Sequence, residues 1–147
     1  MRNDPDFYAA YVMIHIFGGG SFTSRLYTEV RERRGLVYSV GTGLYPFDHS
    51  ALILGSAATA NERAHETLAV IKTEWSKMAS DGISQKELDD AKTFLTGSYP
   101  LRFSSSGRIA SMLVGLQVAR LGIDYMQRRT RLNNSVTRDD LQPAAHR

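Results

Sequence analysis

The chain has 147 residues, which is the length of one ordinary domain or of a piece of a longer protein. Its composition, with 42% hydrophobic and 22% charged residues, is that of a globular protein, and the lack of cysteine excludes disulfides, iron–sulfur clusters and thiol catalysis. The net charge of +3 is uneven, because residues 101–147 hold 8 Arg and 3 Asp and follow a slightly acidic part. We interpret this basic part as solvated helix surface rather than as a nucleic-acid site.

A helix is the first predicted element, and it extends to Phe17 from an N-cap at Asn3 or Asp4. Pro5 suits its first turn, where a missing N–H costs nothing. His15 lies within this apolar helix and is predicted to be packed rather than to bind a metal. The helix is predicted to end at a run of residues that lets the backbone turn sharply: Gly18, Gly19 and Gly20.

A second helix is predicted from Ser21 to Gly35, because glycine suits the left-handed cap. One apolar stripe repeats every four residues along it: Phe22, Leu26 and Val30. After Gly35 the hydrophobic period changes to two, which predicts a strand with three residues on one face: Leu36, Tyr38 and Val40. Residues 46–49 have turn chemistry, with His49 expected to face solvent. The apolar run 51–56 then predicts a second strand that is covered on both faces.

Helices are predicted for the rest of the chain, and none of its apolar runs is long enough to span a membrane. Capping-box spacing marks three starts: Thr59 with Glu62, Ser84 with Glu87, and Thr137 with Asp140. Apolar residues at helical spacing mark core-facing stripes: Leu68, Ile71, Trp75, Met78, Leu88, Ala91, Leu95, Ile109, Met112, Leu113 and Leu116. A short helix is predicted from about Asp124.

Two strands are too few for a stable sheet, whereas these helices need a sheet face to bury against. The sequence therefore predicts one α+β domain over residues 1–147 that is incomplete at its ends and is a fragment of a longer chain. Open sheet edges favour pairing with another copy, so some homo-association is expected. The residues by themselves indicate little chemistry, because no His cluster has metal-ligand spacing and no phosphate loop or nucleophile elbow appears.

One segment is specific, and it runs from Gly18 through Ser24-Arg25-Leu26 and Arg34-Gly35-Leu36 to Val40. It resembles the C-terminal-type, non-zinc domain of the pitrilysin/insulinase family of zinc peptidases, which includes the mitochondrial processing peptidase and small bacterial zinc proteases. The resemblance covers about the whole chain and continues in three further segments: residues 3–8, 89–102 and 122–125. It implies a mostly antiparallel sheet with helices packed on one face.

The resemblance also implies a division of labour between two halves that close like a clamshell around a peptide substrate. The zinc ion is expected in a partner half that carries an H-x-x-E-H motif, in the same full-length chain or in a separate subunit. This chain lacks that motif and is expected to hold no metal or other cofactor and to cut nothing alone. The compartment stays open between bacterial periplasm and cytoplasm, with the periplasm slightly favoured by the resemblance.

The family's Arg/Tyr pair falls on Arg31 and Tyr38, for which the resemblance implies catalytic and substrate-binding roles. Tyr38 would donate its hydroxyl proton toward the scissile carbonyl, and Arg31 would hold substrate carbonyls or a carboxylate. The residues alone leave other interpretations open. Arg31 could be a solvated arginine like Arg33 and Arg34, and Tyr38 could be a core tyrosine. The run of Gly18, Gly19 and Gly20 suits a substrate-contacting loop or a simple helix stop.

Two other functions remain as alternatives at this point. The first is a non-proteolytic structural subunit of the same fold, like the core subunits of respiratory complexes. The second is nucleic-acid binding through the basic part, which would show itself as salt-dependent affinity.

Overall fold

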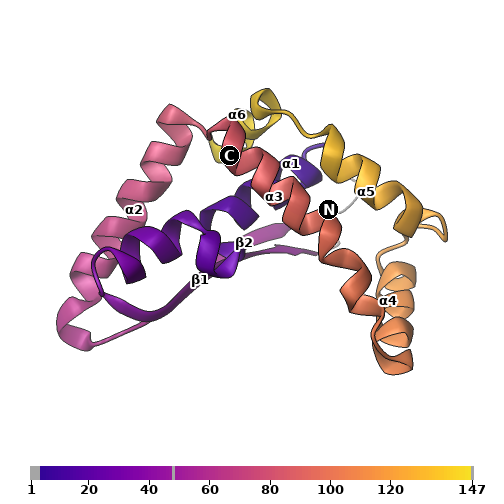
Figure 1. Ribbon diagram of the computed structural model, residues 1–147, viewed down its shortest axis with the longest axis horizontal. Coiled ribbons are helices and arrows are strands. Elements are labelled where there is room, and N and C mark those ends of the chain that lie inside the picture. Colours follow the sequence, from indigo (N-terminus) through magenta and orange to yellow (C-terminus); the bar gives the residue numbers. More distant parts are fainter. Residues whose placement is uncertain (1–3, 48, 147) are drawn as a thin grey trace.

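The computed structural model describes residues 4–47 and 49–146 (Figure 1). Six α-helices follow one another in these residues: α1 (Phe7–Ile14), α2 (Ala64–Asp81), α3 (Gln85–Gly97), α4 (Ser106–Val118), α5 (Tyr125–Ser135) and α6 (Arg138–His146). Two strands, β1 (Val37–Pro46) and β2 (Ala51–Thr59), lie between α1 and α2. None of the described helices is both long enough and apolar enough to cross a lipid bilayer.

Short helical segments complete the chain: the π-helices η1 (His15–Gly19) and η3 (Tyr27–Glu32) and the 3₁₀-helices η2 (Ser21–Thr23), η4 (Asn61–Arg63) and η5 (Tyr99–Phe103). The helix predicted to end at Phe17 thus continues to Gly19 with wider turns. It begins at Phe7 rather than at the predicted Asp4, and the alternative N-cap Asn3 lies outside the described residues.

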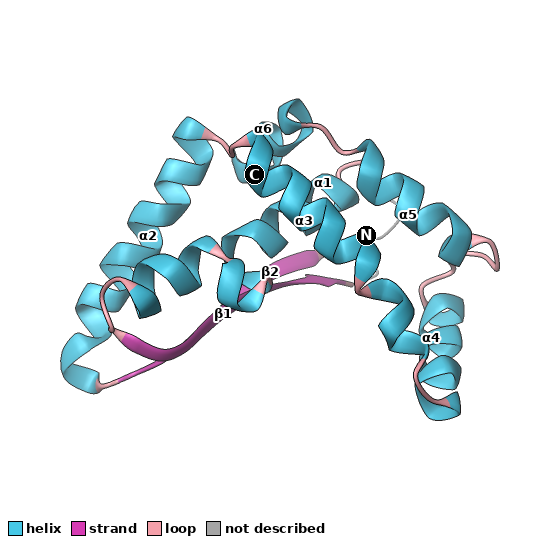
Figure 2. Ribbon diagram, viewed as in Figure 1, coloured by secondary structure: helices cyan, strands magenta, loops and turns pink. Residues whose placement is uncertain are grey.

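The two strands form an antiparallel hairpin, and α1 and α3 lie over the same side of it (Figure 2). Val40 and Leu44 of β1 pack from the sheet against the core. The core itself is built mainly from the first helix and the segment after it, with Phe17 2% and Leu26 1% exposed. Phe17 meets Trp75 of α2 edge to face at 4.9 Å between ring centroids, which joins the long helix to this core. The predicted α+β class, with helices on one face of an antiparallel sheet, is confirmed.

The second strand differs from its prediction, because β2 is exposed along nearly its whole length rather than covered on both faces. Leu52 is 47%, Ile53 42% and Leu54 50% exposed. An apolar run predicts that a strand is buried, but it does not indicate which segment packs against it. No third strand pairs with the hairpin in the described residues.

Local capping signals gave mixed results. Ser84 and Glu87 form the predicted capping box, in which the Ser84 hydroxyl accepts from the Glu87 N–H and the Glu87 carboxylate accepts from the Ser84 N–H. Thr137 and Asp140 pair in the same way. The box predicted at Thr59 is wrong, because the Thr59 hydroxyl donates instead to the Leu36 carbonyl at 2.6 Å, and α2 begins only at Ala64.

Candidate functional site

The predicted pair of Arg31 and Tyr38 is placed by the turn between η3 and β1. Gly35 adopts φ +60°, a left-handed conformation that favours glycine, as predicted for the cap. The Gly35 N–H donates to the Arg31 carbonyl at 2.9 Å, and the Leu36 N–H donates to the Val30 carbonyl at 3.0 Å. These bonds end the helix and start the strand within five residues. Because the turn is so tight, the end of η3 and the start of β1 lie side by side.

Tyr38 lies at an irregularity of the hairpin. Val37 pairs with Thr59 and Ser39 pairs with Ala58, so Tyr38 is the extra residue of a β-bulge. Its side chain is 80% exposed, whereas Leu36 and Val37 before it are buried. The predicted single face of Leu36, Tyr38 and Val40 is therefore wrong, because the bulge breaks the alternation. The alternative interpretation of Tyr38 as a core residue is also wrong.

Arg31 lies close to two tyrosine rings. Its guanidinium carbon is 4.9 Å from the Tyr27 ring centroid and 5.7 Å from the Tyr38 ring centroid, and its Nη1 donates to the Tyr27 hydroxyl at 2.8 Å. Sequence reasoning missed Tyr27, although its i,i+4 spacing from Arg31 on a helix indicates contact. The structure thus brings the predicted pair together and adds Tyr27 as a second aromatic partner of Arg31.

The neighbouring arginines differ from Arg31 in their partners. Arg33 Nη1 and Arg34 Nη1 both donate to the Glu29 carboxylate, at 2.6 and 2.7 Å. The Glu29 side chain that accepts from both arginines is only 16% exposed, whereas that of Arg33 is 67% exposed. No Asp or Glu among the described residues forms an ion pair with Arg31. Arg31 therefore differs from the two arginines beside it, because its contacts within the described part of the chain are with tyrosines and not with a carboxylate.

The glycine run lies against β1 rather than in an open loop. A Cβ added to Gly18 would lie 2.6 Å from Thr42 Oγ1 and 3.0 Å from the Thr42 backbone nitrogen. A Cβ on Gly20 would lie 2.9 Å from the His15 carbonyl oxygen. Gly18 and Gly20 are buried and Gly19 is exposed, so only Gly19 offers its surface to a ligand. Close packing of η1 on β1 accounts for Gly18, and the approach to the His15 carbonyl within the same helical segment accounts for Gly20.

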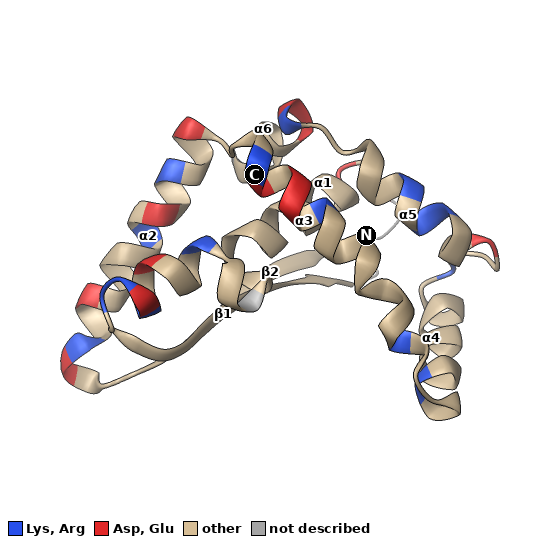
Figure 3. Ribbon diagram, in the orientation of Figure 1, with Lys and Arg blue, Asp and Glu red and all other residues tan. Residues whose placement is uncertain are grey.

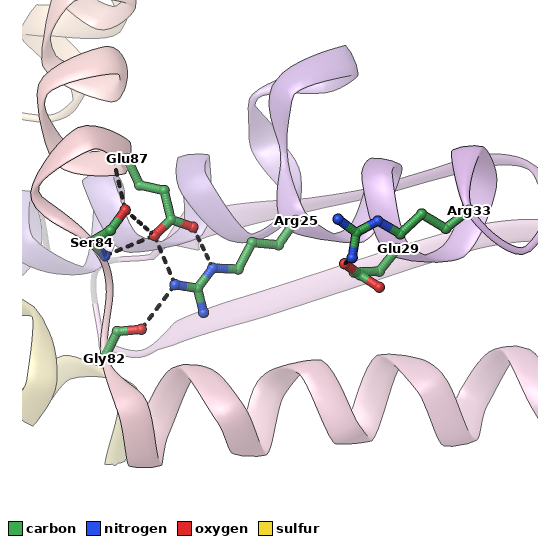
Figure 4. A network of polar contacts seen from close by, with 6 residues as sticks. All are labelled: Arg25, Glu29, Arg33, Gly82, Ser84 and Glu87. Carbon is green, nitrogen blue, oxygen red and sulfur yellow. Dashed lines mark hydrogen bonds and ion pairs between the residues drawn. The ribbon is translucent and has the colours of Figure 1, made fainter.

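Arg25, from the family-like segment, binds the start of α3 (Figure 4). Its Nε and Nη2 donate to the two carboxylate oxygens of Glu87 at 2.6 and 2.9 Å, and Nη2 also donates to the Gly82 carbonyl at 2.9 Å. Burial raises the pKa of Glu87, but hydrogen bonds from Arg25 and Ser84 outweigh it and lower that pKa to about 2. Arg25 therefore holds the turn that leads to Arg31 against α3.

This bidentate pair predicts a loss of stability in acid. The folded pKa of Glu87 lies below its ordinary value of 4.5, so the stabilisation is complete above pH 4.5 and disappears as the pH falls toward 2. We expect Glu87→Gln to lower the free energy of unfolding at pH 7 by about 2 kcal/mol, after allowance for partial exposure of the pair, and by roughly half of that or less at pH 3.

Thermal unfolding of the full-length protein as a function of pH measures this effect. Asp90→Asn is the matched control, because it removes a carboxylate from the same helix whose partner, Lys86, is 84% exposed. We expect no measurable shift for the control. An equal loss at pH 3 and pH 7 for Glu87→Gln would show that the Arg25 pair is not the source of the stabilisation.

The basic C-terminal part is not uniformly solvated, which corrects the prediction made for it. Arg129 of α5 is only 6% exposed and lies 4.2 Å from the Tyr99 ring centroid, with Nη1 donating to the Leu95 carbonyl. It lines a cavity of about 760 Å³ between α1, α4 and α5. The Arg positions of α5 lie within one turn of one another, at 128, 129 and 131, whereas most of the α4 ribbon is uncharged in Figure 3.

Histidines and carboxylates do not gather in the described residues. No three His, Asp or Glu side chains of residues 4–47 and 49–146 are placed to hold a metal ion. His15 stacks on Phe94 with ring centroids 5.1 Å apart, and burial lowers its pKa. His49 is exposed in the turn. The donor groups of the described residues therefore do not form a zinc site.

Comparison with known proteins identifies relatives. The sequence profile of the family described as "Peptidase M16 inactive domain" matches residues 1–95. An uncharacterized zinc protease of Mycobacterium bovis is 36% identical over 104 residues, covering 71% of this chain and 24% of the relative. An uncharacterized zinc protease of Streptomyces coelicolor is 30% identical over 147 residues, covering 98% of this chain and 31% of the relative. A protein of Helicobacter pylori named non-peptidase homolog YmxG is 37% identical over 91 residues, covering 62% of this chain and 21% of the relative.

Solved structures agree with these relatives. The peptidase M16 inactive domain from Pseudomonas fluorescens superposes with a TM-score of 0.84 at 32% identity, covering 97% of this chain and 34% of that chain. A protease from Helicobacter pylori has the same fold, with a TM-score of 0.84 at 19% identity, covering 98% of this chain and 34% of that chain. This chain spans about a quarter to a third of the length of the curated relatives that it matches. The chain belongs to the peptidase M16 inactive-domain family, as a non-zinc domain of a zinc protease family.

Proposed function

We propose that this chain is the substrate-binding, non-zinc half of a zinc-dependent metallopeptidase that cleaves peptides inside a clamshell chamber. The partner half carries the zinc ion in an H-x-x-E-H motif, in the same full-length chain or in a separate subunit. The observation that carries the proposal is the pair of half-buried Arg31 and exposed Tyr38 at one rim of the hairpin, where Arg31 has no acidic partner among the described residues. Membership of the M16 inactive-domain family supports it.

The two side chains divide the work. In the closed chamber the Tyr38 hydroxyl donates a hydrogen bond to the scissile carbonyl oxygen as negative charge develops on it. The Arg31 guanidinium binds substrate carbonyls or a carboxylate through its planar fork of donors. The Lewis-acid chemistry of zinc is supplied by the partner half. Exposed Gly19, next to the buried Gly18 and Gly20, contributes a backbone contact to the bound peptide.

Arg31→Ala tests the proposal in the full-length protein combined with its zinc-bearing half. We expect KM for an internally quenched peptide to rise about tenfold or more, because a charge-assisted hydrogen bond to the substrate is lost. Arg33→Ala is the matched control, because it removes the same charge only two residues from Arg31. The Arg33 side chain is 67% exposed and is paired with Glu29. Equal KM values for the two variants would contradict the substrate role of Arg31.

A second candidate function is a structural subunit of the same fold without proteolytic duty. The Helicobacter pylori relative named non-peptidase homolog favours it. The same preparation separates the two functions, because a structural subunit leaves peptide cleavage absent even with the zinc-bearing half present. In that case the contacts of Arg31 and Tyr38 serve assembly instead of substrate binding.

A further inference from the structure

We propose that Tyr27 is a positioning residue, which holds the Arg31 guanidinium in place beside Tyr38. This inference rests on the proposed function, because it assigns to Tyr27 a role in the substrate contact made by Arg31. It is carried by three contacts along one line of side chains, which runs from η2 through η3 to the bulge of β1.

The first contact fixes one edge of the guanidinium. Arg31 Nη1 donates to the Tyr27 hydroxyl at 2.8 Å, and the guanidinium carbon lies 4.9 Å from the centroid of the same ring. Tyr27 thus contacts Arg31 through both its ring and its hydroxyl. A long arginine side chain loses rotamer freedom when it binds a ligand, and a partner that restrains it beforehand reduces this loss.

The second contact restrains Tyr27 itself. Phe22 of η2 meets the Tyr27 ring edge to face, with 4.9 Å between centroids and 81° between ring planes. Phe22 is 67% exposed, although the helical stripe of Phe22, Leu26 and Val30 predicted that it would be buried. Phe22 therefore packs against Tyr27 instead of facing the core, and this contact restrains the Tyr27 ring.

The third contact places the guanidinium near Tyr38. The Tyr38 ring centroid lies 5.7 Å from the guanidinium carbon, so Arg31 is close to both the Tyr27 and the Tyr38 rings. Among the described residues, only the Tyr27 hydroxyl is within hydrogen-bond distance as an acceptor for Arg31 side-chain donors. The remaining N–H groups of the fork are available to a peptide beside the Tyr38 hydroxyl.

Tyr27→Phe tests the inference, because it keeps the ring and removes only the hydroxyl. In the full-length protein with its zinc-bearing half, we expect KM for an internally quenched peptide to rise about five- to tenfold while kcat changes less than twofold. Tyr45→Phe is the matched control, since Tyr45 lies at the other end of β1 and is 49% exposed. The control should leave both constants unchanged.

A double variant separates positioning from a direct substrate contact. If Tyr27 acts through Arg31, then Tyr27→Phe adds no further change to KM in the Arg31→Ala background. Additive effects of the two substitutions on KM would overturn the positioning role of Tyr27 and leave the substrate role of Arg31 intact. A normal KM for Tyr27→Phe, with a raised KM for Arg31→Ala, would have the same meaning. A normal KM for Arg31→Ala would overturn both this inference and the substrate role of Arg31. Thermal unfolding of each variant, expected within about 2 °C of the parent, excludes misfolding as the cause.

Discussion

Replacing Tyr38 with Phe should lower kcat of the assembled peptidase by about 10²- to 10³-fold, while KM changes little. The phenol hydroxyl is the group proposed to donate to the developing oxyanion, and such a donor acts mainly in the transition state. The phenylalanine ring keeps its place beside Arg31, so the substitution isolates the hydroxyl. Cleavage of an internally quenched peptide by the full-length protein with its zinc-bearing half measures both constants.

The exposure of Tyr38 allows an effect on catalysis to be separated from an effect on folding. A side chain that is 80% exposed contributes little to the core, so we expect the thermal unfolding midpoint of Tyr38→Phe to match the parent. The kinetic pattern also distinguishes Tyr38 from Arg31, whose loss should raise KM instead. An unchanged kcat for Tyr38→Phe would remove the proposed oxyanion role and leave only a binding surface at this rim.

Replacing Gly18 with Ala should destabilise the domain by about 2 kcal/mol, because the new methyl group meets Thr42 of β1. The methyl carbon would lie 2.6 Å from Thr42 Oγ1 and 3.0 Å from the Thr42 nitrogen, so the backbone has to move as well as the side chain. Thermal unfolding of the full-length protein measures the loss. Thr42→Ala in the same chain should recover part of it by removing the nearer atom, Oγ1.

Gly97→Ala is the matched control for this variant. Gly97 lies at the end of α3, and an added Cβ meets no atom within 4 Å. We expect it to be neutral or to stabilise the protein by up to about 1 kcal/mol, because alanine has less backbone freedom to lose on folding. Equal stability of Gly18→Ala and Gly97→Ala would show that η1 does not pack on β1 as closely as described.

Sequence reasoning predicted best the features that depend on a few neighbouring residues. The capping box of Ser84 and Glu87 and the left-handed cap at Gly35 both form as predicted. Each needs only backbone groups three or four residues away, so no distant segment is required to decide the outcome. The placing of Arg31 near Tyr38 follows from that same tight turn.

Three failed predictions depend on segments that are distant in sequence. The Thr59 hydroxyl donates to the Leu36 carbonyl instead of capping a helix, and these two groups are close only because the strands pair. The bulge at Tyr38 depends on the register with β2, which alternation within one strand does not reveal. Arg129 is buried by Tyr99, 30 residues earlier in the chain, although helical spacing alone predicted a surface residue.

The bulge has a practical consequence for protein engineering. An inserted residue on a regular strand exchanges the inner and outer faces of all that follows, whereas here the extra residue is absorbed at one position and the pairing resumes at Ser39. The chemistry of the rim at position 38 is thereby uncoupled from the packing of Leu36 and Val37. A saturation library at this single codon can therefore survey acids, bases and hydrogen-bond donors with little penalty in folding yield.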